Sequence, residues 1–162
     1  MKRLFALIVL GWLLVMPAWS NPVDMATVKR VAHNFLMSRN VPVTKSMPSV
    51  AYTATAEVAS AKSTDLFYVL NCGDAFVVVA ADDRIVPVLG YSTEGAFDPQ
   101  NVPIQMQDYL EAFSQEITAI INEPSCPSLY QERWATLLSD SYAATKGTAV
   151  VGPLLSTIWA QT

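Results

Sequence analysis

The centre of the chain, residues 66–91, reads LFYVLNCGDAFVVVAADDRIVPVLGY. Two apolar runs, Leu66–Leu70 and Phe76–Ala80, have the length and the aromatic and β-branched content of strands. Asn71–Asp74 separates them and contains the residue types that tight turns favour. This stretch therefore predicts a β-hairpin.

The flanking residues extend the hairpin into a sheet. Asp82–Arg84 is expected to form the next turn, with its acidic side chains in solvent. Val86–Tyr91 follows as a short strand, and its Pro87, which has no N–H to donate, places it at the edge of the sheet. Upstream, apolar and small polar residues alternate from Val50 to Ala56, which predicts a further strand.

Helical periodicity appears on both sides of these strands. Met25–Ser38 is amphipathic, and Asp24 is a suitable N-cap. A second helix is expected from Pro103, as its first residue, to about Asn122, and a third over Tyr130–Ser139. The apolar positions expected to face the core of the second helix are Ile104, Tyr109, Phe113, Ile117 and Ile120 or Ile121. The order helix, about four antiparallel strands, two helices predicts an α+β domain.

The first twenty of the 162 residues have the features of a secretory signal peptide. Lys2 and Arg3 precede an apolar run, and small residues at the −3 and −1 positions predict cleavage after Ser20. We therefore expect a secreted or periplasmic protein whose domain begins at residue 21. No later segment approaches the length of a membrane span, so no membrane association is expected after cleavage.

The charge of the remaining chain argues against nucleic acid as a partner. Without Lys2 and Arg3, the chain has 14 acidic and 8 basic residues, a net charge of −6. It therefore lacks the excess of basic residues that binding to a phosphate backbone requires.

Few residues are candidates for chemistry. His33, the single histidine, falls on a helix face, and Cys72 lies in a predicted turn with no histidine nearby in sequence. Asp82 and Asp83 are adjacent, so on a strand their side chains would point in opposite directions. The spacing of histidine and cysteine fits no metal site, and we expect neither a cofactor nor catalysis by this chain alone. Whether Cys72 and Cys126 pair or remain thiols is open.

Binding is the remaining class of function. The segment Tyr91–Val102 contains Pro99 and joins the edge strand to the helix that begins at Pro103. It is suited to present a short extended segment to a partner. The alternative is that it is an ordinary connection between a strand and a helix.

Two blocks, FVVVAADDR at 76–84 and PVLGYSTEGAFD at 87–98, resemble the prodomain of streptopain-type cysteine peptidases and the related streptopain inhibitor. The resemblance covers Asp24 to Gln161. It implies an α+β domain that binds a streptopain-like, papain-fold peptidase, covers its active site and keeps the zymogen inactive. Residues 151–161 resemble the start of the mature peptidase, and the catalytic Cys and His of that family would lie beyond the end of this sequence.

The resemblance also implies roles for individual residues. The asparagine that enters the peptidase cleft in the family corresponds to Asn101, although Asn101 is also placed to cap the following helix. Activation cleavage is expected near Lys146 and Gly147. The implied organisation is a signal peptide at 1–20, an inhibitory domain at 21–145, and an activation linker with the start of a peptidase domain at 146–162.

Three interpretations follow. The first is an inhibitory prodomain that acts on a streptopain-like cysteine peptidase in cis or in trans. The second is the N-terminal fragment of an interrupted peptidase zymogen, which the peptidase-like residues at 151–161 favour. The third is a secreted binding module with no peptidase partner, for which Asn101 would have no role.

Overall fold

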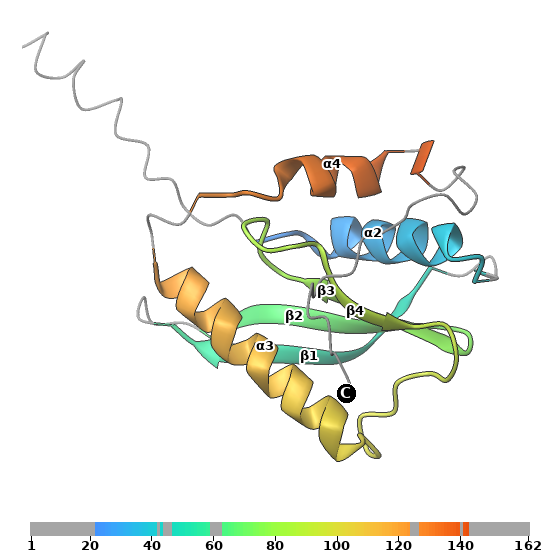
Figure 1. Ribbon diagram of the computed structural model, residues 1–162, viewed down its shortest axis with the longest axis horizontal. Coiled ribbons are helices and arrows are strands. Elements are labelled where there is room, and N and C mark those ends of the chain that lie inside the picture. The colour runs from blue at the N-terminus through green and yellow to red at the C-terminus, as the bar shows by residue number, and fades with distance from the viewer. Residues whose placement is uncertain are drawn as a thin grey trace, which may run out of the picture.

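The computed structural model describes residues 22–41, 43, 47–58, 63–123, 127–139, 141 and 142. These residues form a four-stranded antiparallel sheet with helices on both faces (Figure 1). The elements, in chain order, are α2 (Met25–Ser38), β1 (Ser49–Glu57), β2 (Ser63–Cys72), β3 (Ala75–Ala80), β4 (Val88–Ser92), α3 (Ile104–Asn122) and α4 (Gln131–Leu138). The predicted α+β class is confirmed.

The strands lie in the order β1-β2-β3-β4, so each pairs with its neighbour in sequence. The predicted hairpin is formed by β2 and β3, whose last pair is Cys72 with Ala75. Gly73 and Asp74 make the two-residue connection, in which Gly73 has a φ of +59°. A positive φ at the first central residue is typical of a type II′ turn, which glycine adopts without steric strain.

The helices divide between the two faces of the sheet (Figure 1). The helix α2 packs on β2, β3 and α4, whereas α3 packs on β1 and β2. Successive side chains along each strand point alternately toward α3 and toward α2. Phe67 of β2 meets Phe113 of α3, with ring centroids 6.5 Å apart, while Tyr91 of β4 meets Phe35 of α2 at 4.9 Å. The apolar parts of β2 and β3 are therefore buried on both faces, which explains why their sequences are nearly continuously apolar and do not alternate.

The first helix follows the prediction closely. Its N-cap is Asp24, whose Oδ1 accepts hydrogen bonds from the N–H groups of Ala26 (2.9 Å) and Thr27 (3.0 Å). The side chains predicted to form its apolar face are all buried, namely Val28, Val31, Ala32, Phe35 and Leu36.

Several predicted boundaries are wrong in detail. The edge strand begins at Val88, after Pro87, because regular pairing needs a backbone N–H; Pro87 contributes only its carbonyl, to the N–H of Ala80 at 3.1 Å. Pro103 precedes α3 in an extended conformation (ψ 145°) and is not its first residue. At the hairpin, Asn71 and Cys72 belong to β2 and not to the turn.

The predicted apolar face of α3 is also partly wrong. Ile117 is buried as expected, but Ile104 and Tyr109 are 61% and 63% exposed. Leu110 is buried in their place. The face of α3 that packs against the core contains Met106, Leu110, Phe113 and Ile117, at spacings of three and four residues. Ile104 and Tyr109 are exposed because they lie outside this face of the helix.

Candidate functional site

The segment between β4 and α3 crosses one end of the α3 face of the sheet (Figure 1). It leaves β4 through a turn in which the Ser92 hydroxyl donates to the carbonyl of Glu94 (2.6 Å) and accepts from its N–H (3.1 Å). Gly95 follows with a φ of +80°, in the left-handed region where glycine is favoured. This turn directs the chain back toward the sheet.

Phe97 anchors the middle of this segment. Its side chain is 7% exposed and packs against the rings of Phe76 and Tyr52, at centroid distances of 5.8 and 6.1 Å. The side chain of Asn71 holds its backbone from both sides: Oδ1 accepts from the Phe97 N–H (2.9 Å) and Nδ2 donates to the Phe97 carbonyl (2.8 Å). The amide thus makes the same pair of hydrogen bonds to Phe97 that the backbone of a residue in a neighbouring antiparallel strand would make.

A tight turn over residues 98–101 follows the anchor. The Asp98 carboxylate accepts from the N–H of Gln100 at 3.0 Å, and the Asp98 carbonyl accepts from the N–H of Asn101 at 3.1 Å. Downstream, the Gln107 side chain reaches back from α3 and donates to the Val102 carbonyl at 2.7 Å. The turn is therefore held at both of its ends, by Phe97 and by Val102.

Asn101 is exposed at the end of this turn. The N-cap of α3 is Pro103, and no side chain provides a capping hydrogen bond there among the residues that the structure describes. The alternative prediction, that Asn101 caps the helix, is therefore wrong. Its amide remains available to an external group.

Asn101 borders a surface hollow of about 600 Å³. The hollow lies between the turn, the first half of α3 and β1. Its lining residues are Tyr52, Phe97, Pro99, Gln100, Asn101, Val102, Gln107, Leu110, Glu111 and Ser114. This lining contains no histidine or cysteine and a single carboxylate, so it offers surface for contact and not a set of groups for catalysis.

The residues considered for chemistry lie apart from this segment. His33 is half-buried on α2, with Nδ1 3.4 Å from Oδ1 of Asn34. Cys72 is a buried free thiol in β2, and burial raises its pKa, which is opposite to the shift that a nucleophile needs. Within the described ranges, no three His, Cys, Asp or Glu side chains group as metal ligands would.

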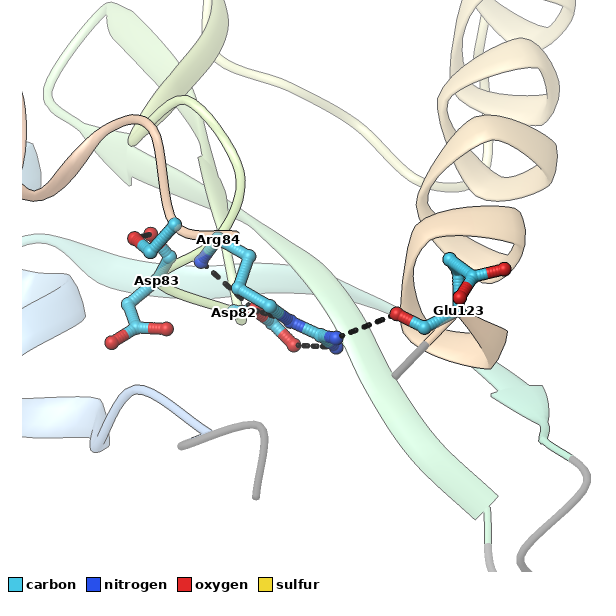
Figure 2. Close-up of polar contacts among 5 residues, drawn as sticks. Asp82, Asp83, Arg84 and Glu123 are labelled. Carbon is cyan, nitrogen blue, oxygen red and sulfur yellow. Dashed lines mark hydrogen bonds and ion pairs between the residues drawn. The ribbon is translucent and has the colours of Figure 1, made fainter. Parts of the chain in front are cut away.

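The expectation that Asp82 is a solvated turn residue is wrong. Asp82 is 2% exposed, and its carboxylate pairs with the Arg84 guanidinium, from Nη2 to Oδ2 at 2.9 Å (Figure 2). The guanidinium also donates from Nη1 to the carbonyl of Glu123 at 3.5 Å, at the end of α3. The N–H of Val23 donates to the carbonyl of Ala81 at 2.9 Å. The turn therefore joins the start of the domain to the end of α3.

Asp83 and the residues after it extend this junction. The Asp83 carbonyl accepts from the Ser128 hydroxyl at 2.9 Å, and the Ile85 carbonyl accepts from the indole Nε1 of Trp134 in α4 at 2.9 Å. Burial, and next the negative charge of Asp82, raise the pKa of the Asp83 carboxyl. These contacts are structural, since they attach the residues after the turn to Ser128 and to α4.

Some predicted features lie outside the described residues. They are the signal peptide, Cys126, and the activation region at Lys146 and Gly147. In the described part of the chain, no helix is both long and apolar enough to span a bilayer.

Comparison with known proteins identifies the family. The family model described as Spi protease inhibitor matches residues 20–117. A relative, the thiol protease/hemagglutinin PrtT of Porphyromonas gingivalis, is 30% identical over 129 residues, which are 78% of this chain. The chain spans only 15% of the length of that relative. No solved structure matches.

The matched region contains the β2–β3 hairpin, β4, Asn101 and most of α3. The resemblance that the blocks at 76–84 and 87–98 indicated is thus confirmed by an independent match over 98 residues, well over half of the chain. The chain belongs to the Spi protease inhibitor family.

Proposed function

We propose that this protein is an inhibitory propeptide domain that binds and blocks the active-site cleft of a streptopain-like cysteine peptidase. Membership of the Spi protease inhibitor family and similarity to a thiol protease support a protease-inhibitor propeptide of the cysteine peptidase type. The proposal adds the mode of action, in which the turn at 98–101 enters the cleft and Asn101 contacts it.

The observation that carries this proposal is the exposed Asn101 on a turn held at both ends. A segment that is already ordered loses little conformational entropy when it binds. The Asn101 amide has both a donor and an acceptor, so it satisfies polar groups in a cleft. It does so without placing a peptide carbonyl in the attack geometry that hydrolysis requires.

The proposed organisation of the chain follows the same reasoning. Residues 1–20 are a signal peptide that directs secretion, and residues 21–145 are the inhibitory domain. Lys146 and Gly147 lie in the activation-cleavage region, within a linker that leads into peptidase-like sequence at 151–161. We propose the same cleft contact for a peptidase in the same polypeptide and for a separate one.

The test is a titration of the protein into an active streptopain-type peptidase, with hydrolysis of a peptide substrate as the signal. The proposal predicts inhibition at one-to-one stoichiometry that is competitive with substrate. Asn101→Ala is expected to weaken it, whereas Gln131→Ala, an exposed substitution on α4, is not. Equal inhibition by the two variants would show that Asn101 does not contribute to the contact with the peptidase. A lack of inhibition by the unmodified protein would contradict the proposed function.

A further inference from the structure

Asn71 is a polar residue on an inward-facing position of β2. It lies on the same face as Phe67, which packs under α3, and its partner across the β2–β3 ladder is Phe76. A side-chain amide in such apolar surroundings is stabilised only when its donor and acceptor are both used. Both are used on one residue, Phe97, in the segment that leads to Asn101.

The separation of Asn71 and Phe97 in sequence is 26 residues, so the contact ties a distant segment to the sheet. Phe97 is followed directly by the Asp98 turn that ends at Asn101. Without the two bonds from Asn71, the upstream end of that turn would be held by the packing of the Phe97 side chain, which includes its ring contacts with Phe76 and Tyr52. The direction of its backbone would then be free to vary about the buried ring.

We infer that Asn71 is a positioning residue whose amide sets the presentation of the turn at 98–101, and thereby the potency of inhibition. This inference rests on the proposed function. The affinity of a binding segment falls in proportion to the fraction of molecules that hold the competent conformation. Asn71 keeps that fraction high before the peptidase arrives, although its own side chain is directed at Phe97 and not at the partner.

The variant Asn71→Asp tests the two bonds with almost no change in shape. An ionised carboxylate at this position still accepts from the Phe97 N–H, but it cannot donate, and it places a negative charge against the Phe97 carbonyl. A protonated carboxyl group restores the donor. The pair of bonds from residue 71 to the backbone of Phe97 is called the clamp on Phe97. The variant loses this complete pair at neutral pH and regains it in acid, because a protonated carboxyl group has one donor and one acceptor, as the amide does.

The experiment compares the inhibition constants of the variant and the unmodified protein for one streptopain-type peptidase, at several values between about pH 4 and pH 7. The ratio of the two constants cancels the pH dependence of the peptidase itself. The expected ratio is roughly ten-fold or more at pH 7, as the loss of one such hydrogen bond implies, and it falls toward one in acid. In parallel, amide hydrogen exchange at Phe97 is expected to be slow in the unmodified protein and faster in the variant at pH 7, because repulsion between the carboxylate and the Phe97 carbonyl weakens the one bond that remains, from the Phe97 N–H.

Asn34→Asp is the matched control. The Asn34 side chain donates to the Leu137 carbonyl at 2.8 Å, between α2 and α4, on the opposite face of the sheet. This substitution removes the same kind of bond and lowers stability, but it leaves the clamp on Phe97 intact. Its inhibition constant is expected to stay within about two-fold of the unmodified protein, provided that both are folded under the assay conditions.

The outcomes are distinguishable. If the unmodified protein inhibits and Asn71→Asp inhibits equally at pH 7, the inference is overturned. If both Asn variants weaken inhibition equally, the effect is one of general stability, which also overturns it. If the unmodified protein does not inhibit, the proposed function is overturned. The effect of Asn71 on the potency of inhibition is then overturned as well, whatever the exchange rate at Phe97.

Discussion

Removal of the Arg84 side chain is expected to destabilise the domain strongly. Asp82 and Arg84 have side chains only 3% and 9% exposed. The Asp82 carboxylate accepts from Nε at 3.0 Å and from Nη2 at 2.9 Å. Arg84→Met keeps the length of the side chain but eliminates both charge-assisted bonds and the positive charge.

The magnitude follows from these contacts. Breaking a buried ion pair by removing one partner typically costs about 3–5 kcal/mol, because a charge stays buried without its counterion. The backbone N–H of residue 84 still donates to Asp82, at 2.9 Å, so we expect the lower end of that range. A loss of about 3 kcal/mol corresponds to a Tm lower by roughly 10 °C in a domain of this size.

Urea denaturation followed by far-UV circular dichroism measures the free energy of unfolding directly. Arg133→Met is the matched control, since Arg133 is exposed and its guanidinium contacts only the ring of Tyr130 (5.7 Å) among the interactions described. It is expected to cost less than about 1 kcal/mol. Adding Asp82→Asn to Arg84→Met should recover part of the lost stability, because the buried charge that has lost the Arg84 guanidinium is then gone.

Two results would refute this reasoning. One is a loss for Arg84→Met no larger than that of the Arg133 control. The other is a double variant that is less stable than Arg84→Met alone, which would mean that the remaining carboxylate was not the source of the penalty.

Two further predictions concern the same junction. The raised pKa of Asp83 means that its charged form is less favourable in the folded state, so the stability of the domain falls as pH rises through the window just above 3.8. Asp83→Asn should therefore increase the free energy of unfolding at pH 7 but not below that window. Urea denaturation at the two pH values measures this difference. Trp134→Phe removes the donor to the Ile85 carbonyl inside the domain and should cost about 1–3 kcal/mol, measured in the same way; an unchanged midpoint would show that this bond contributes no net stability.

The elements of this fold are predictable because their signals are local. Alternation and turn residues indicate the β2–β3 hairpin, and helical periodicity with an N-cap indicates α2. The burial of Asp82 is different in kind. Its partner Arg84 is close in sequence, but its burial depends on the segments around Val23 and Glu123, which come from distant parts of the chain and leave no sign in the local pattern.

The candidate site was only partly accessible from sequence. Asn101 is indicated by the family resemblance, whereas the pattern of residues around it also allowed a helix cap, which α3 does not have. Asn71 falls within Asn71–Asp74, whose residue types predict a turn, and this local signal conceals its place in β2. A polar residue two positions after Val69, in phase with the buried side chains of β2, was the available signal, since an inward-facing amide requires a partner.

The exposed start of α3 illustrates a further limit. The face that packs against the core contains Met106, Leu110, Phe113 and Ile117, whereas Ile104 and Tyr109, which are five residues apart, fall outside it. Because a helix is apolar toward the core only at spacings of three and four residues, apolar side chains outside that pattern stay exposed even where the helix packs on the core.

A site-specific crosslink tests whether the turn at 98–101 enters the cleft of the peptidase. Gln100, exposed and adjacent to Asn101, is replaced by the photoreactive residue benzoylphenylalanine, and the complex with a streptopain-type peptidase is irradiated and analysed by mass spectrometry. We expect a crosslink to residues that line the active-site cleft, and we expect it to disappear when the catalytic thiol has first been blocked with a covalent, cleft-filling reagent. A crosslink that lies away from the cleft, or that persists after the cleft is filled, would contradict it.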